Sequence, residues 1–211
     1  STSLKLREKL SSEAFNATAS YDSNIANYFN NITENSFPKK KTFAFKLHEK
    51  LRYGENPHQE ASVYIDGDYK LKQLNGKKLS FNNYSDIFAA LRISKTLPKN
   101  KGTVIVKHAN PCGVSIETNK VDSFKLALKS DPISAFGGIV SCNFKINKKV
   151  AEEINKLFFE VIIADGFDKE TLRIFKRKKN LRLIDSSNLK NENLQNFKND
   201  FNTVSYTHLT L

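Results

Sequence analysis

The strongest constraint on the fold is a regular alternation between short apolar runs and helix-length amphipathic segments. The apolar runs are typical of buried strands and lie at 103–106, 138–142, 161–163 and 181–184. A helix is expected to open at Ser85-Asp86, ahead of the first run. The helices between the runs have expected N-caps at Asp122, Asn147 and Asp168. This alternation predicts a layered α/β domain with a largely parallel or mixed sheet.

The residues before this domain show other periodicities. Residues 3–29 carry apolar side chains at helical intervals, and Asp22 is the expected N-cap between two helices. Residues 30–41 are polar and contain a proline, which predicts a linker. Alternating apolar residues then predict two strands, at 43–47 and 61–65.

The composition fits a folded protein with one sizeable domain. The chain has 211 residues, 39% of them hydrophobic, with 16 Phe. Because Met is absent even at position 1, we expect a fragment of a longer reading frame. There is no apolar run of the roughly 20 residues that span a bilayer, and the N-terminus lacks a signal-peptide pattern. Cys112 and Cys142 form no disulfide framework, so a reducing, cytoplasmic setting is expected.

The net charge of +12 raises the question of nucleic-acid binding. The densest basic runs, at 39–41, 99–101 and 176–179, each lie beside an expected element boundary. This spacing favours a solvated surface over a continuous binding stripe, and we predict neither a nucleic-acid nor a membrane partner. A positive field would still attract small anionic substrates such as phosphates.

Three polar clusters follow the ends of expected elements. In the first, residues 52–59, Arg52 could bind a phosphate in a bidentate manner and Tyr53 offers a phenol and a stacking face. In the third, residues 131–138, Gly137 would let a ligand approach the backbone and Phe136 could form an aromatic wall. Taken alone, the third cluster also fits an ordinary glycine-containing turn.

The second cluster begins with Lys107-His108, directly after the apolar run 103–106. Ligands of open α/β sheets gather at the carboxyl ends of strands, so the pair is well placed. His108 could serve as a general base, because imidazole is mostly neutral near pH 7, and Lys107 could stabilise a developing oxyanion. Alternatively, Lys107 extends to solvent and His108 is a hydrogen-bonded core histidine. The residues 110–113, dense in turn formers, predict a tight loop that aims polar groups at a ligand.

His108, Cys112 and Cys142 are residue types that bind zinc. The zinc deaminases need H-x-E and P-C-x-x-C, but His108 is followed by Ala109-Asn110 and Pro111-Cys112 by Gly113-Val114-Ser115, so no catalytic metal is expected. The chain also lacks the glycine-rich loops of nucleoside triphosphate and dinucleotide sites.

Four segments, in order, resemble the bifunctional family that combines AICAR transformylase with IMP cyclohydrolase. They are RYGENPHQ, QLNGKKLSFNNYSDIFAAL (73–91), VIVKHANPCGV (104–114) and DPISAFGGIV (131–140). The resemblance runs from about residue 42 to 184, and residues 4–29 are similar to the end of the cyclohydrolase portion. One departure is Asp165, which replaces a Pro common in the family.

This resemblance implies formyl transfer from 10-formyltetrahydrofolate to AICAR, a purine precursor. It implies that His108 is the general base and that Lys107 assists it and stabilises the tetrahedral intermediate. It assigns substrate binding to Arg52, Tyr53, Asn110, Phe136, Gly137 and Glu160. The family fold is a pair of cytidine-deaminase-like α/β subdomains without the zinc, and the family usually works as a homodimer.

The resemblance also divides the chain. Residues 1–34 are the expected helical end of the cyclohydrolase portion, 35–41 a linker and 42–185 the first transformylase subdomain. Residues 186–203 are expected to be a polar loop or insertion, and 204–211 a non-native tail. The fragment alone is expected to be inactive. Two other function classes fit the sequence less well: a non-catalytic nucleotide-binding module, which has no need of the Lys107-His108 pair, and a nucleic-acid binder.

Overall fold

The computed structural model describes residues 2–66, 71–189, 196–200 and 203–207. The chain divides into two units, which are considered separately. The first comprises Ser1–Glu49, Val63–Tyr69 and Glu192–Leu211, and the second comprises Lys50–Ser62 and Lys70–Asn191. In the described part of the chain, no helix is long and apolar enough to cross a membrane.

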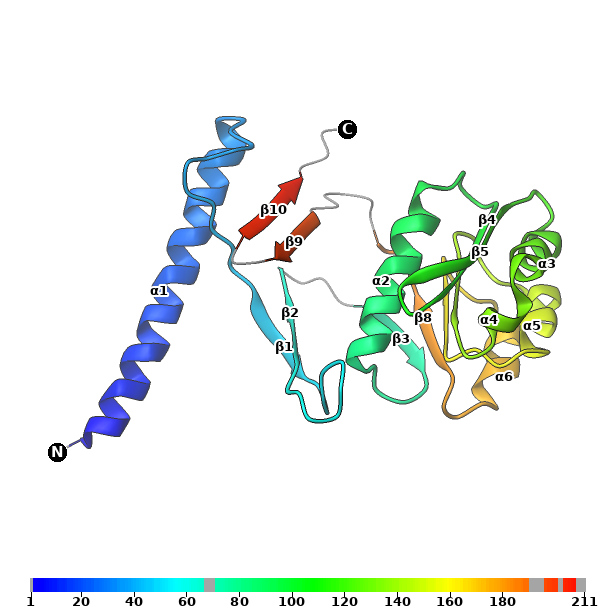
Figure 1. The fold of residues 1–211 in the computed structure, drawn as a ribbon, viewed down its shortest axis with the longest axis horizontal. Coiled ribbons are helices and arrows are strands. Elements are labelled where there is room, and N and C mark those ends of the chain that lie inside the picture. Colours follow the sequence, from blue (N-terminus) through cyan, green and yellow to red (C-terminus); the bar gives the residue numbers. More distant parts are fainter. Residues whose placement is uncertain (1, 67–70, 190–195, 201–202, 208–211) are drawn as a thin grey trace. The chain divides into compact units, whose positions relative to one another are not determined.

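The first unit is dominated by one long helix, α1 (Leu4–Ile32), which starts at the N-cap Ser3 (Figure 1). The prediction of two helices separated at Asp22 is therefore wrong: helix-compatible residues continue through that position, and nothing there ends the hydrogen-bond ladder. Strands β1 (Lys46–Lys50) and β2 (Ser62–Ile65) form a two-stranded sheet.

Two further strands, β9 (Asn196–Asp200) and β10 (Thr203–Thr207), pair in an antiparallel manner. Strand β9 lies before the predicted boundary between residues 203 and 204, and β10 spans it. The predicted domain limits of the whole chain stay predictions.

The second unit contains a six-stranded mixed sheet in the order β3-β8-β7-β6-β4-β5. Its strands are β3 (Lys72–Asn75), β4 (Gly102–Lys107), β5 (Asn110–Ile116), β6 (Ile139–Cys142), β7 (Val161–Ala164) and β8 (Arg182–Asp185). Strands β6, β7 and β8 are parallel, whereas β4 runs antiparallel to β6 and β3 antiparallel to β8. This mixed sheet confirms the α/β class predicted from the alternating pattern.

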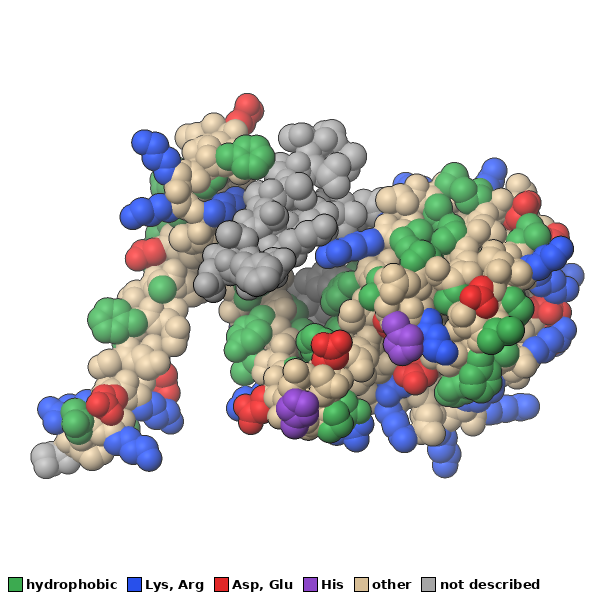
Figure 2. Space-filling model, viewed as in Figure 1, with side chains coloured by type: hydrophobic (Ala, Val, Ile, Leu, Met, Phe, Trp, Pro, Cys, Tyr) green, Lys and Arg blue, Asp and Glu red, His purple; other side chains and the backbone are tan. Residues whose placement is uncertain are grey.

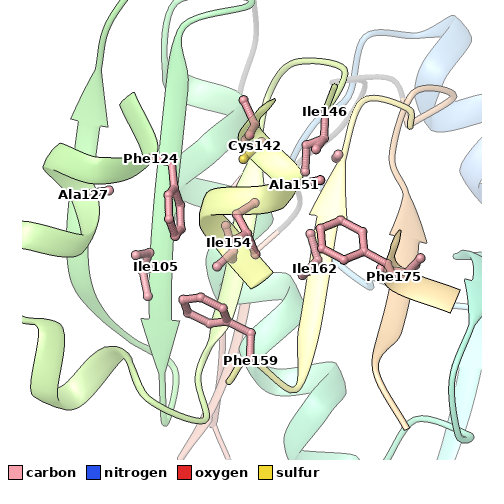
Figure 3. Packing of buried hydrophobic residues seen from close by; sticks show 14 of the residues in the cluster. Ile105, Phe124, Ala127, Cys142, Ile146, Ala151, Ile154, Phe159, Ile162 and Phe175 are labelled. Atoms are coloured by element: carbon pink, nitrogen blue, oxygen red, sulfur yellow. The ribbon is translucent and has the colours of Figure 1, made fainter. Parts of the chain in front are cut away.

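Helices cover both faces of the sheet. They are α2 (Phe81–Thr96), α3 (Lys120–Ser130), the short α4 (Pro132–Ala135), α5 (Lys148–Asn155) and α6 (Lys169–Lys176). Helix α2 lies on one face, and α3, α5 and α6 lie on the other (Figure 1). Each face has its own buried core, and Figure 3 shows the larger one, where Phe124 and Phe159 meet edge to face with ring centroids 6.2 Å apart. Each fully buried aromatic or aliphatic side chain contributes about 1.5–3 kcal/mol.

The N-caps explain where the helices start. Asn147 and Asp168 cap α5 and α6 as predicted, each accepting a backbone N–H three residues on. Two predicted caps are wrong. Helix α3 is capped by Asn119 and not by Asp122, which lies in its first turn. Helix α2 starts at the N-cap Ser80, whose capping box with Asn83 fixes the start five residues before Ser85.

Candidate functional site at one edge of the sheet

Because β4 runs antiparallel to its neighbour β6, the end of β4 and the starts of the parallel strands meet at one edge. Lys107 ends β4, Gly138 and Glu160 immediately precede β6 and β7, and Arg182 begins β8. We call this the amino edge, after the amino ends of β6, β7 and β8. Lys107 is thus at the carboxyl end of its own strand, as expected, but at the amino ends of the three parallel strands.

His108 and Ala109 form the two-residue turn of a β4–β5 hairpin, in which Lys107 pairs with Asn110. Both turn residues have left-handed backbones, with φ of 52° and 58°. A two-residue hairpin turn of type I′ requires this conformation, although it normally uses Asn, Asp or Gly. The predicted tight loop at 110–113 is wrong, since these residues belong to β5.

His108 is exposed, so it is not a core histidine. Two hydrogen bonds hold its turn: Asp86 Oδ1 accepts Ala109 N–H at 2.6 Å, and Asn110 Nδ2 donates to the His108 carbonyl at 2.7 Å. The amide of Asn110, predicted to bind substrate, therefore bonds within the hairpin.

Lys107 is half-buried and joins the second and third clusters. Its Nζ donates a hydrogen bond to the carbonyl oxygen of Phe136 at 3.0 Å. The next residue, Gly137, has a left-handed φ of 75°, which glycine adopts without a steric penalty. The exposed ring of Phe136 lies 5.5 Å from the ring of Phe158, between centroids, so an aromatic surface borders the Lys107 ammonium.

The turn that precedes Phe136 is itself fixed by a cap. Asp131 Oδ1 accepts the backbone N–H of Ser134 at 2.9 Å at the start of α4. Hydrogen bonds from the Ser134 side chain and backbone lower the pKa of Asp131, and the charge of Lys107 adds to this effect. Asp131 is therefore ionised near neutral pH and contributes a negative charge beside the lysine.

Glu160 has partners from two other elements. Its Oε2 accepts a hydrogen bond from Asn83 Nδ2 at 3.0 Å and lies 3.7 Å from a terminal nitrogen of Arg182. Its backbone N–H donates to the Gly138 carbonyl at 3.0 Å, which connects it to the third cluster. The sequence did not single out Asn83 or Arg182, although Asn83 lies within the family-like segment 73–91.

The first cluster forms a compact loop between β1 and β2. Gly54 N–H donates to the Gln59 carbonyl at 2.7 Å and Gln59 N–H donates to the Asn56 carbonyl at 3.0 Å. The Arg52 guanidinium is exposed and lies 5.6 Å from the centre of the Tyr53 ring.

The charge of Arg52, in this loop, acts on Arg182 at the amino edge. Burial lowers the pKa of Arg182, the charge of Arg52 lowers it further, and Glu160 opposes the decrease. The Arg182 guanidinium lies 3.7 Å from Glu160, and the charge of Arg52 acts on Arg182 as well, so the positive charge here suits an anionic group such as a phosphate.

The two cysteines differ in surroundings. Burial raises the pKa of the Cys142 thiol to about 12, so it is a neutral core side chain. Burial also raises the pKa of the half-buried Cys112 thiol; the charges of Asp131 and Asp86 add to the increase, while Lys107 opposes it. Cys112 thus shares its surroundings with the amino edge but carries no thiolate near neutral pH.

A cavity of about 460 Å³ lies at the opposite edge, where the parallel strands end. It is lined by Ser94, Lys95, Leu97, Lys99, Asn100, Asn143, Asp165, Ser187 and Leu189. Asp165 forms an ion pair with Lys95 at 3.1 Å and accepts a hydrogen bond from Ser186 Oγ at 2.7 Å. The acidic residue that departs from the family pattern therefore bridges α2 and the end of β8.

Comparisons with known proteins all indicate the same family. A model of the AICARFT/IMPCHase bienzyme family matches residues 1–210. The chain is 50% identical over 174 residues to the bifunctional purine biosynthesis protein PurH of Leptospira biflexa, covering 82% of this chain and 34% of that protein. Proteins of the same name from Listeria monocytogenes and Parvibaculum lavamentivorans are 42% and 44% identical, each over 87% of this chain. The chain spans about a third of the length of these relatives.

Proposed function

The chain belongs to the AICARFT/IMPCHase bienzyme family, and we propose that its amino edge is part of a formyltransferase site of purine synthesis. The observation that carries the proposal is the hydrogen bond from Lys107 Nζ to the Phe136 carbonyl. This bond joins two of the clusters that the resemblance links to the reaction. The substrates are AICAR and 10-formyltetrahydrofolate.

The chemistry requires a proton acceptor and a stabilised oxyanion. The aromatic amine of AICAR attacks the formyl carbon, a carbon–nitrogen bond forms, and the formyl oxygen takes the negative charge. His108 accepts the proton that leaves the amine, and the Lys107 ammonium stabilises the oxyanion. When the bond between the formyl carbon and the folate nitrogen breaks, the folate nitrogen takes up a proton. The exposure of His108 on its turn supports the role of an accessible base.

The remaining groups bind and orient the nucleotide. Arg52 and Tyr53 contribute a guanidinium and an aromatic ring, and the excess positive charge at Arg52 and Arg182 supports a phosphate contact. Gly137, whose left-handed backbone carries no side chain, is proposed to let the nucleotide approach closely, while its own N–H donates to the Phe158 carbonyl at 2.8 Å; Phe136 is proposed as an aromatic wall. Glu160 is proposed as an acidic contact. Asn110 is proposed to act through the hairpin, since its amide bonds to the His108 carbonyl.

Further proposals follow from the family. The sheet of the second unit is one of two cytidine-deaminase-like subdomains that need no catalytic metal. The chain spans 34% of the length of the Leptospira biflexa relative, and IMP cyclohydrolase activity, a second subdomain and a homodimer are proposed for the full-length protein. On this basis the 211 residues alone are expected to be inactive. A cytoplasmic location is a separate proposal.

The competing class, a nucleic-acid binder driven by the net charge of +12, has little support. On the face shown in Figure 2, Lys and Arg side chains are scattered in small groups and do not form one continuous stripe.

A bound structure tests the formyltransferase proposal: AICAR is soaked into crystals of the full-length protein that carries this sequence. We expect the base beside Lys107 and Phe136 and the phosphate near Arg52. AICAR in the cavity between Lys95 and Asn143, with the amino edge empty, would overturn the proposal.

A further inference from the structure

We propose that Asp86 is a positioning residue for His108, a role that rests on the formyl-transfer function proposed above. Asp86 lies in the second turn of α2, and its Oδ1 accepts the Ala109 N–H at 2.6 Å. The carboxylate thus connects helix α2 to the turn that carries the proposed base.

The turn needs such a connection because its backbone is intrinsically unfavourable. His108 and Ala109 have φ of 52° and 58°, a region in which the Cβ atom of an L-residue crowds the following carbonyl oxygen. Neither residue is glycine, and neither is Asn or Asp, the residues that adopt this region most readily. Such conformations persist only where the surrounding structure over-determines them.

Helix α2 is a rigid anchor for the turn. Its residues Ile87 and Ala90 are fully buried against the sheet, so the Asp86 backbone cannot move without disturbing this core. The second bond of the turn, from Asn110 to the His108 carbonyl, lies within the hairpin and moves with it. Asp86 therefore fixes the hairpin tip to the body of the domain, which the Asn110 bond cannot do.

The electrostatic surroundings agree with this geometry. The charges of Asp86, Asp131 and Lys107 all act on the Cys112 thiol, which places the Asp86 carboxylate within the same polar surroundings as Lys107. The 2.6 Å separation lies at the short end of the range for an N–H···O hydrogen bond. The family-like segment 73–91, which directly precedes the hairpin segment 104–114, thus supplies a group that orders it.

The kinetic test uses the full-length protein and three variants. Asp86→Ala removes the acceptor, Asp86→Asn keeps an oxygen acceptor without the charge, and Glu152→Ala is the matched control, since Glu152 is exposed on α5. We expect Asp86→Ala to lower kcat for formyl transfer by about 10- to 100-fold, the size of loss that a misplaced group causes. The KM for AICAR should change little, and Asp86→Asn should recover most of the loss because it restores the bond.

A rescue separates positioning from a general loss of structure. Ala109→Gly in the Asp86→Ala background should recover part of kcat, because glycine adopts a left-handed φ without the Cβ penalty. Unchanged kcat in Asp86→Ala, or an equal loss in Glu152→Ala, would overturn the positioning role.

A second readout does not depend on formyl transfer. Hydrogen exchange of the Ala109 amide should be slow in the wild type and roughly tenfold or more faster in Asp86→Ala, because the bond that protects it is lost. If the wild type transfers no formyl group, the proposed function fails while this exchange result still decides whether Asp86 holds the turn. Equal exchange in the two proteins would show that it does not.

Discussion

Lys107 Nζ lies 3.0 Å from the carbonyl oxygen of Phe136, so a side chain at the end of β4 is held by the backbone of the turn that leads into β6. Residues 29 positions apart in the sequence are thereby brought to the same edge of the sheet. The bond uses one of the three donors of the ammonium group, which leaves the others for a ligand.

Replacement of Lys107 tests its part in the proposed reaction. Lys107→Met keeps the apolar stem but removes the charge and the bond to Phe136. We expect kcat for formyl transfer in the full-length protein to fall by about 10²- to 10³-fold, as for loss of an oxyanion donor. Steady-state kinetics would check this value, with Lys129→Met, on the exposed side of α3, as the control. A Lys107→Met enzyme with wild-type kcat would exclude Lys107 from the chemistry.

Gly138→Ala tests the close approach of backbones beside Lys107. An added Cβ would lie 2.7 Å from the Val106 carbonyl oxygen, which belongs to β4 and cannot move freely. We expect a loss of about 1–3 kcal/mol in the free energy of unfolding, measured by urea denaturation of the 211-residue chain. The nearby Ile133→Ala, whose side chain is 86% exposed, should change it by less than about 0.5 kcal/mol. Equal effects of Gly138→Ala and Ile133→Ala would mean that the backbone at Gly138 does not approach the Val106 carbonyl this closely.

Two positions on α3 test the larger core. Phe124 is 1% exposed and packs against Phe159, whereas Leu126 on the same helix is 44% exposed. Phe124→Ala should lower the free energy of unfolding by about 3–5 kcal/mol because it leaves a cavity. Leu126→Ala should lower it by less than about 1 kcal/mol. Denaturation curves that rank the two variants in reverse would contradict the assignment of the buried face.

Asp168 provides a pH-dependent test of a predicted cap. Burial would raise its pKa, but the hydrogen bonds from Thr171, at 2.6 Å to the backbone N–H, outweigh burial and lower it. A lowered pKa in the folded state means that Asp168 contributes stability above the unfolded pKa of about 3.9 and loses it as the pH falls through the folded value. Asp168→Ala should therefore cost about 1 kcal/mol at pH 7 and less below pH ~4.

Asp168→Asn separates the cap from its charge. Its amide oxygen still accepts the Thr171 N–H, so most of the stability at pH 7 should remain, while the part of the pH dependence that Asp168 contributes should disappear. A cost of Asp168→Ala that stayed constant from pH 7 to pH 3 would show that the ionised carboxylate is not the capping group.

The layered sheet and several caps could be predicted because their causes are local. The apolar runs that became β6, β7 and β8 are buried on both faces, and Asn147 and Asp168 bond within one helical turn. Hydrophobic periodicity predicts the buried strands, and cap chemistry predicts the helix starts.

The hairpin at His108 could not be predicted in this way. A two-residue turn is normally marked by Asn-Gly or Asp-Gly, and His-Ala carries no such mark. Its left-handed backbone depends on Asp86, which is 23 residues away and was assigned to the start of a helix. Likewise, the antiparallel direction of β4, which sets the edge where Lys107 lies, depends on pairing with β6 and not on its own residues. The roles of the candidate site residues stay predictions.

The central claim is that His108 is the base of a formyl-transfer site, and the most direct test is turnover by the full-length protein with His108→Ala. Single-turnover formyl transfer to AICAR should fall by about 10²- to 10⁴-fold, the usual contribution of a general base. AICAR binding should be retained, since Arg52, Tyr53 and Gly137 are unchanged. A His108→Ala protein that transferred the formyl group at a near-normal rate would contradict the account.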